Sequence, residues 1–224
     1  MFNAFLQLLY PKLCFACEDP LFESEEFICT HCRISLPRVD YRSDSPWWLR
    51  AKFDGLINYQ DVQSFMVFTA GGRVQQLMHQ IKYKGEEELG WYLGFCAGQS
   101  LKKYHFFGEI NCVIPVPLHA KRLRKRGYNQ AECIARGLAE GLVKPLIAQG
   151  LVKISQTDSL IGQDRSQRFS LLKDSFEVNV DLEEKHPLIV DDTLTTGATL
   201  LAAGEKIKAA GAQGISFFTL AALK

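Results

Sequence analysis

The feature that most constrains the fold of this chain is a short apolar run that ends in two acids. Residues 188–199 read LIVDDTLTTGAT. An apolar run bounded by a Thr- and Gly-rich stretch is typical of a buried strand, and we expect a helix to begin near Ala198. In an open parallel sheet the carboxyl ends of the strands border the ligand crevice. The order strand, acids, loop, helix therefore predicts an α/β fold with a ligand site at residues 191–197.

Each residue type in this stretch has a chemical reason. Ionised Asp191 and Asp192 only accept hydrogen bonds, which suits two neighbouring sugar hydroxyls. The next five residues would supply backbone amides and hydroxyls to a phosphate at the start of the helix. They are Thr193, Leu194, Thr195, Thr196 and Gly197. The plainer alternative is an ordinary turn in which Asp192 or Thr193 only caps the helix. No G-x-x-x-x-G-K-[ST] sequence occurs in the chain, which argues against a P-loop site.

Four cysteines near the N-terminus have the spacing of a metal site. Cys14 and Cys17 form one C-x₂-C pair, and Cys29 and Cys32 form another. Four thiolates at this spacing favour a structural Zn²⁺, with an iron–sulfur centre as the weaker option. Disulfides are a further alternative, and His31 is an alternative to Cys32 as the fourth ligand.

The acidic stretch resembles a known ligand motif. An apolar strand followed by Asp-Asp and Thr-x-Thr-Thr-Gly resembles the motif with which type I phosphoribosyltransferases bind 5-phosphoribosyl 1-pyrophosphate (PRPP). The resemblance implies that Asp191 and Asp192 hold the ribose hydroxyls, that residues 193–197 hold the 5′-phosphate, and that Mg²⁺ accompanies the pyrophosphate.

Nearly the whole chain resembles the ComF/GntX family of bacterial proteins. The resemblance is carried by the cysteine module, by VIPVPL at 113–118, by RGYNQ at 126–130 and by IKYKG at 81–85. Arg165 and Arg168 also fit, whereas Leu171 departs from an Asn that relatives usually carry. The family is associated with DNA uptake, natural transformation and growth on DNA. The resemblance therefore implies single-stranded DNA and competence proteins such as a DNA helicase as partners.

The strongest cluster of positive charge is KRLRKR at residues 121–126. We expect this run to lie at the N-terminal end of a helix capped by Asn129, where cations cost a few tenths to about 1 kcal/mol each. Such a cost predicts an anionic partner, either the pyrophosphate of PRPP or DNA phosphates with Tyr128 as a stacking residue. The candidate phosphate ligands are Arg122, Arg124, Lys125 and Arg126. The alternative is a solvated loop that binds nothing in particular.

Strand-like and helix-like patterns alternate through the rest of the chain, which favours a doubly wound, mostly parallel sheet. We expect strands near 63–70, 111–118, 150–155, 188–191 and 215–221, with helices near 74–81, 86–104, 131–142 and 200–210. Pro115 and Pro117 predict that the second of these strands lies at an edge or end. We divide the chain into an N-terminal helix and Cys₄ zinc module (1–36), a linker (37–55) and a phosphoribosyltransferase-like domain (56–224).

Charge and hydropathy restrict the partners and the location. The formal net charge of +1 argues against strong nonspecific attraction to nucleic acid, so any DNA contact must be local. No apolar run is long enough to span a membrane. Residues 1–13 lack the basic start and the cleavage site of a signal peptide, and we interpret them as a short amphipathic helix of a cytoplasmic protein. We expect the polar residues 156–170 to close over the site.

Two functions compete at this stage. The first is an enzyme that transfers phosphoribosyl to an unknown acceptor and releases pyrophosphate. The second is a nonenzymatic interaction protein that binds single-stranded DNA or a partner helicase. Cys96, Cys112 and Cys133 serve neither, because they fall in apolar patterns and are expected to be buried.

Overall fold

The computed structural model describes residues 11–42, 44–154 and 174–224. Its centre is a sheet of four parallel strands in the order β1-β6-β5-β2. These strands are β1 (Asp61–Phe68), β2 (Cys112–Pro115), β5 (Pro187–Leu194) and β6 (Ser216–Leu223). β5 and β6 lie inside the sheet and are almost wholly apolar up to Asp191, as expected for parallel strands covered on both faces.

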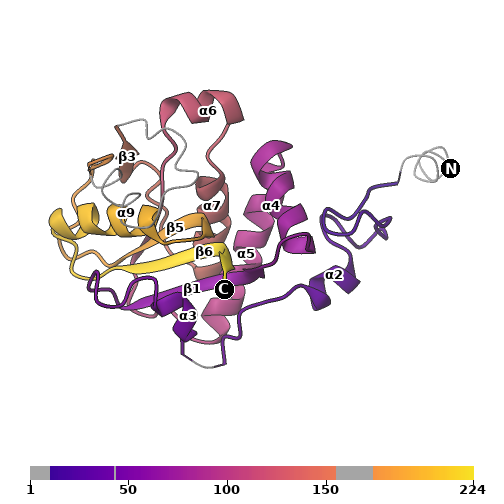
Figure 1. Cartoon of the computed structure of the whole chain (residues 1–224), viewed down its shortest axis with the longest axis horizontal. Helices are drawn as coiled ribbons and strands as arrows, with labels where there is room; N and C mark the ends of the chain where they lie inside the picture. The colour runs from indigo at the N-terminus through magenta and orange to yellow at the C-terminus, as the bar shows by residue number, and fades with distance from the viewer. Residues whose placement is uncertain (1–10, 43, 155–173) are drawn as a thin grey trace.

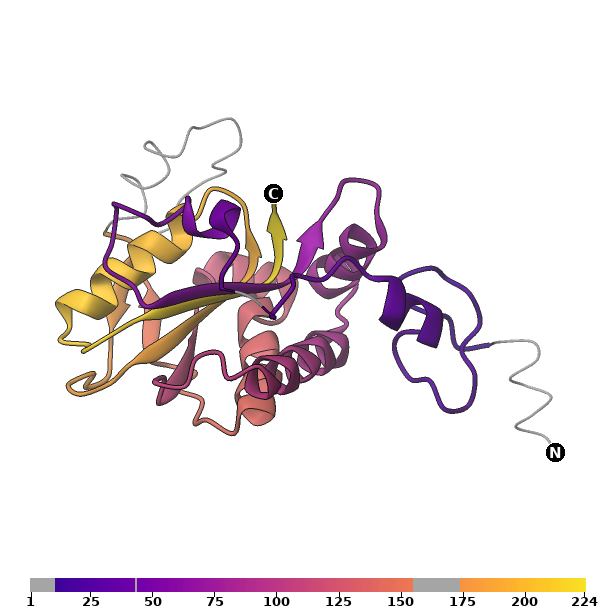
Figure 2. The same ribbon diagram turned by 90° about the horizontal axis from the view of Figure 1, so that it is seen from below.

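Helices cover both faces of the sheet, which confirms the doubly wound architecture. α9 (Ala198–Ala209) and α3 (Trp47–Arg50) lie over one face, and α5 (Glu87–Lys103) and α7 (Gln130–Leu142) lie over the other (Figures 1 and 2). α4 (Arg73–Tyr83) follows β1 and buries one side, formed by Val74, Leu77, Met78 and Ile81.

The α5 and α7 helices pack with their backbones in direct contact. A Cβ atom added at Gly137 would lie 1.9 Å from the carbonyl oxygen of Trp91, and one added at Gly94 would lie 2.2 Å from that of Ile134. No side chain fits at these positions, so the close packing of the two helices depends on their glycines.

Both edges of the sheet are covered by other parts of the chain. Beside β1, the Val67 amide donates to the Pro37 carbonyl over 2.8 Å, and beside β2 the Ile147 amide donates to the Val113 carbonyl over 2.9 Å. β2 is the last strand of the four and ends at Pro115, as its prolines predicted.

The cysteine module packs against the helices that follow β1. Its helix α2 (Thr30–Ser35) receives a hydrogen bond from the Arg73 guanidinium to the Ser35 hydroxyl over 2.7 Å. The rings of Phe27 and Tyr92 lie 5.1 Å apart. The module projects from one side of the molecule (Figures 1 and 2). The helix expected over residues 1–13 falls mostly outside the described residues.

Three elements differ from the sequence-based expectation. β3 (Leu151–Lys153) forms where a strand was expected, but it pairs with β4 (Phe176–Val178) in a separate antiparallel sheet. β5 continues past the acids to Leu194, and the basic run forms a helix of its own, α6 (Ala120–Arg126). The domain boundaries that we expect after residue 36 and after residue 55 stay predictions. Leu49 and Phe53, which belong to the expected linker, are fully buried in the core.

Among the described residues, no helix combines the length and the apolar character that a bilayer span requires.

Candidate functional site

The two acids lie near the carboxyl end of an interior strand, where the sequence predicts a ligand site. The side chains of Asp191 and Asp192 are both partly exposed, whereas the residues before them are buried. The Asp192 amide donates to Asp191 Oδ1 over 2.8 Å, which fixes the orientation of that carboxylate.

The expected phosphate loop is shorter than predicted. Thr193 and Leu194 still belong to β5 and pair with Ala221 and Ala222 of β6. Leu194 is 1% exposed, so its side chain packs in the core, and its part in phosphate binding stays a prediction.

The loop itself consists of residues 195–197 and leads directly into α9. Gly197 is the N-cap, with φ +83, a left-handed conformation that favours glycine. Neither Asp192 nor Thr193 caps the helix, which excludes the plain capping turn. The Ala198 amide donates to Thr196 Oγ1 over 3.4 Å, a long hydrogen bond within the loop. The Lys52 ammonium donates to the Thr195 carbonyl over 2.7 Å and holds the loop from the α3 side. The start of α9 thus offers amides to an anion.

Lys82 reaches the acid pair from the last turn of α4. Its Nζ lies 3.0 Å from Asp192 Oδ1 and donates to Thr193 Oγ1 over 2.9 Å. The side chains of Lys82 and Asp192 are only 22% and 16% exposed, so the ion pair is partly desolvated. Sequence reasoning included Lys82 in a family pattern but did not assign it to the site.

Asp191 lies in a different electrostatic setting from its neighbour. Burial and the adjacent charge of Asp192 raise the pKa of Asp191 to about 7, although Lys82 and Lys153 act in the opposite direction. Burial and the nearby Arg122 lower the pKa of Lys153 to about 8. Lys153, on β3, therefore belongs to the surroundings of Asp191, and Arg122, on α6, lies near Lys153.

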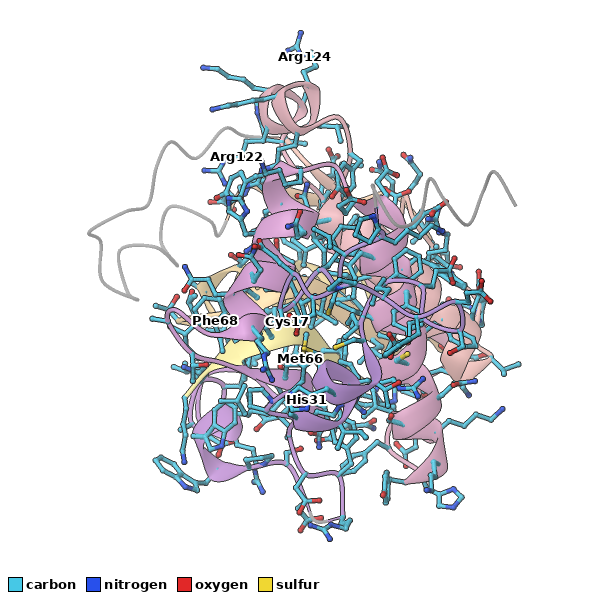
Figure 3. All side chains as sticks on the ribbon, turned by 90° about the vertical axis from the view of Figure 1, so that its right-hand side faces the viewer. Cys17, His31, Met66, Phe68, Arg122 and Arg124 are labelled. Carbon is cyan, nitrogen blue, oxygen red and sulfur yellow. The ribbon has the colours of Figure 1, made fainter. Side chains whose placement is uncertain are left out.

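The basic run does not lie where the sequence predicted. It forms α6, whose N-cap is His119, and Arg124, Lys125 and Arg126 occupy its last turn. Cations stabilise the C-terminal end of a helix, so the expected conflict with the macrodipole is absent. α6 projects from the body of the molecule, with Arg124 at its outer side and Arg122 nearer the core (Figures 1 and 3).

The residues after α6 anchor that helix to α4. Tyr128 is 8% exposed and its hydroxyl donates to the Ile81 carbonyl, so its assignment as a base-stacking residue was wrong. Asn129 caps α7 as expected, accepting from the Ala131 amide over 3.2 Å. The Tyr128 contact ties the segment after α6 to the last turn of α4, which carries Lys82.

The four predicted cysteines form a compact cluster. Their sulfur atoms all lie within 4.8 Å of one another. A tetrahedral site with Zn–S bonds of about 2.3 Å separates its sulfurs by about 3.8 Å, and Cys17 Sγ and Cys29 Sγ are 3.7 Å apart. Amides donate to two of the sulfurs: the Cys29 amide to Cys14 Sγ over 3.3 Å, and the Cys32 amide to Cys29 Sγ over 3.4 Å. Such bonds stabilise thiolates, so the residues fit a metal ion.

The geometry separates the cluster cysteines from His31 and from the other three thiols. Cys32 is fully buried in the cluster, whereas His31 is exposed and does not belong to it. All four cysteines are free thiols and not disulfides. Burial raises the pKa of the other three thiols, on Cys96, Cys112 and Cys133, as expected for inert core residues.

Some sequence-based assignments cannot be placed. Arg165, Arg168 and Leu171, and the segment 156–170 expected to close over the site, lie outside the described residues.

Comparison with known proteins agrees with this architecture. The family model for a phosphoribosyl transferase domain matches residues 130–223, which include the acids, the loop and α9. The chain is 28% identical to Competence protein ComFC of Bacillus subtilis over 96% of this chain and 87% of that protein. It is 25% identical to DNA utilization protein YhgH of Salmonella typhi over 95% of this chain and 98% of that protein. Competence protein F of Haemophilus influenzae is 29% identical over only 57% of each chain.

Two solved structures overlap part of the fold. A hypoxanthine phosphoribosyltransferase from Staphylococcus aureus has 15% identity and a TM-score of 0.38, over 61% of this chain and 64% of that one. An allosteric regulatory enzyme of purine biosynthesis has 18% identity and a TM-score of 0.42, over 63% of this chain and 30% of that one. The chain is thus similar over nearly its whole length to ComFC and YhgH proteins and carries a phosphoribosyltransferase domain, in agreement with the resemblance found in the sequence.

Proposed function

We propose that this protein is a PRPP-binding phosphoribosyltransferase that acts in DNA uptake or DNA utilisation. The observation that carries the proposal is the position of Asp191 and Asp192, which lie near the carboxyl end of β5, three residues before the short loop 195–197 that leads into α9. The carboxylates would accept hydrogen bonds from the ribose 2′- and 3′-hydroxyls. The amides of residues 195–197 would bind the 5′-phosphate.

The positive groups around the acids complete the site. Lys82 and Lys153 approach the acid pair from α4 and β3, and Arg122 of α6 lies near Lys153. We assign them to the pyrophosphate. Mg²⁺, when it is bound together with PRPP, would neutralise further pyrophosphate charge.

The reaction expected of such a site is a displacement at C1 of the ribose. The bond from C1 to the pyrophosphate oxygen breaks and its electron pair leaves with the pyrophosphate, while a nitrogen of the acceptor forms the new bond to C1 and loses its proton. Positive charge develops on the ribose ring, and the carboxylates of Asp191 and Asp192, bonded to the ribose hydroxyls, would stabilise it. Fixing both ends of the sugar positions C1 for attack.

The test is isothermal titration calorimetry with PRPP and Mg²⁺. The wild-type protein should bind, and Asp191→Asn/Asp192→Asn should reduce the affinity at least a hundredfold, because two charge-assisted hydrogen bonds are lost. Asp44→Asn changes an exposed acid elsewhere and should bind as the wild type does. If the wild-type protein does not bind PRPP, the proposal is wrong.

We also propose that the cysteine cluster holds a structural Zn²⁺. A closed tetrahedral site contributes folding energy and leaves no open position for catalysis. Thiols kept reduced suit a cytoplasmic protein, which is the location we propose.

A second function is supported by α6. Within the described parts of the chain, no carboxylate forms an ion pair with Lys121, Arg124 or Lys125, and all three are exposed. We propose that this helix contacts DNA phosphates, with a partner helicase as the further candidate.

The DNA contact is tested by fluorescence anisotropy with a single-stranded oligonucleotide over a range of salt concentrations. Each lost phosphate contact should flatten the slope of log K against log salt by about 0.7. Lys121→Ala/Arg124→Ala/Lys125→Ala should therefore flatten it by about 2, whereas Lys102→Ala/Lys103→Ala on α5 should not. If the α6 substitutions leave the affinity for single-stranded DNA unchanged, the proposed DNA contact is wrong.

A further inference from the structure

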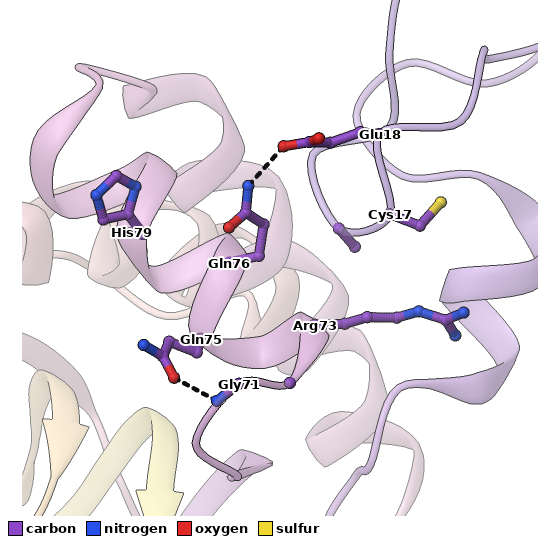
Figure 4. A pocket seen from close by; sticks show the side chains of 9 residues that line it. Cys17, Glu18, Gly71, Arg73, Gln75, Gln76 and His79 are labelled. Atoms are coloured by element: carbon purple, nitrogen blue, oxygen red, sulfur yellow. Dashed lines mark hydrogen bonds between the residues drawn. The ribbon is translucent and has the colours of Figure 1, made fainter.

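A polar cavity of about 450 Å³ lies between the cysteine module and α4 (Figure 4). The module contributes Ala16, Cys17 and Glu18, and the turn after β1 contributes Gly71 and Gly72. α4 contributes four side chains that can donate hydrogen bonds: Arg73, Gln75, Gln76 and His79. A volume of this size is within the range of small-molecule sites.

Contacts across the cavity hold its two walls together. Gln76 Nε2 donates to Glu18 Oε1 over 2.9 Å, which ties α4 to the module. Gln75 Oε1 accepts from the Gly71 amide over 2.6 Å, and Gly71 has φ +72, a conformation that favours glycine in this turn. In the part of the chain that the structure describes, Gln75 Nε2 and the His79 ring nitrogens make no hydrogen bond. The cavity is therefore formed, with polar groups left for a ligand.

The cavity lies along the same side of α4 as the acid pair. Gln75, His79 and Lys82 are spaced i, i+4 and i+7, which places them on one face of the helix. A rise of about 1.5 Å per residue puts His79 one turn, about 4.5 Å along the axis, before Lys82. Lys82 contacts Asp192, so the near wall of the cavity lies one helical turn along α4 from the lysine that reaches the acid pair.

We propose that this cavity binds the acceptor, and that the acceptor is a nitrogen heterocycle attached to an anionic group, as in a nucleotide or the end of a nucleic acid strand. Side-chain amides both donate and accept, and glutamine matches the edge of a base. The Arg73 guanidinium suits a phosphate, and its hydrogen-bond partner within the described ranges is the neutral Ser35 hydroxyl. This inference rests on the proposed function, because it assigns the nucleophile for C1 of the bound ribose.

The cavity also gives the cysteine module a role in the reaction. One wall of the proposed acceptor site comes from residues beside Cys17, so an intact module would be required for acceptor binding. PRPP would still bind to residues 191–197, which the cavity does not include.

The test uses saturation-transfer NMR and calorimetry on the full zinc-loaded chain. The probes are AMP, GMP, CMP and UMP, and a ten-nucleotide single-stranded DNA of mixed sequence. Gln75→Ala/His79→Ala should weaken the binding of at least one probe tenfold or more. Gln99→Ala, an exposed glutamine on neighbouring α5, should leave it unchanged.

PRPP titration of the same variants separates the two proposals. Retained PRPP affinity in Gln75→Ala/His79→Ala shows that the variant is folded and that the lost ligand belonged to the cavity. Binding of a mononucleotide identifies a free nucleotide acceptor, and cavity-dependent binding of the oligonucleotide alone identifies a strand end. The acceptor assignment is wrong if PRPP binds normally but no probe binds, or if PRPP binds normally and the two cavity substitutions leave the probe affinities unchanged. In either case the PRPP proposal stands.

Discussion

Lys82 ion-pairs with the carboxylate that we assign to a ribose hydroxyl, so a ligand must displace it. PRPP offers the displaced ammonium a pyrophosphate, whereas ribose 5-phosphate offers it nothing at C1. Lys82→Met should therefore weaken PRPP binding about ten- to a hundredfold, the value of one charge-assisted hydrogen bond, and leave ribose 5-phosphate binding equal or tighter.

Calorimetry with both ligands measures this discrimination. Lys84→Met, which changes the exposed C-cap lysine of the same helix, serves as the control. Equal weakening of both ligands in Lys82→Met would show that the lysine only supports the fold.

Asp191 makes the stability of the protein depend on pH. Its pKa rises from 3.8 to about 7 on folding, because burial and Asp192 disfavour its charge. Between these two values the native carboxyl keeps a proton that the unfolded chain has released, so the unfolding free energy falls as pH rises through this window. We expect this residue to contribute a fall of about 1–3 kcal/mol between pH 4 and pH 7.5. Urea denaturation of the wild type and of Asp191→Asn measures the free energy of unfolding at each pH. The difference in this free energy between the two proteins should grow from pH 4 to pH 7.5. A constant difference would contradict the raised pKa.

The acids and the loop were predictable because their signal is local. Strand, carboxylates and glycine follow one another in twelve residues, and backbone geometry alone brings them to one edge of the sheet. Lys82 had no such signal, since 111 positions separate it from Thr193. Its place in the site follows from the packing of α4 against β1, which residue patterns do not encode.

At the scale of elements, the glycines between α5 and α7 carry the closest packing. Gly137→Ala should destabilise the protein by about 3 kcal/mol or more, because the added methyl group would meet the Trp91 carbonyl at 1.9 Å and the backbones must separate. Gly108→Ala is the control, since nothing lies within 4 Å of its added Cβ. Thermal unfolding of both variants measures the difference. Similar melting temperatures would show that the helices separate without cost.

Long periodic elements were predicted well, and short ones were not. The helices expected at 74–81, 86–104 and 131–142 all exist, because their apolar faces repeat over several turns. α6 has no buried residue and therefore no apolar period to recognise. β4 has only three residues, too few to show an alternating pattern. Its pairing with β3 depends on tertiary contacts.

At the scale of the whole molecule, the cysteine module stabilises the domain that it packs on. We expect one zinc ion per chain, and Cys32→Ser should lose it, because this sulfur is fully buried in the cluster. The module would then release the contacts of Ser35 and Phe27 with α4 and α5. We expect the melting temperature to fall by about 5–10 °C.

Mass spectrometry of the metal and differential scanning calorimetry check this prediction. Cys96→Ala, outside the cluster, should keep its zinc. Loss of zinc in His31→Ala together with retention in Cys32→Ser would identify the histidine as the fourth ligand instead.

The hydrogen bond between Val67 and Pro37 has a consequence for solubility. An uncovered β1 would present a row of free amides and carbonyls, and such a row recruits strands from other molecules. The segment that joins the cysteine module to the sheet therefore prevents β1 from pairing with strands of other molecules. A shortened protein lacking residues 1–40 would form oligomers or precipitate even where its interior remained correctly packed.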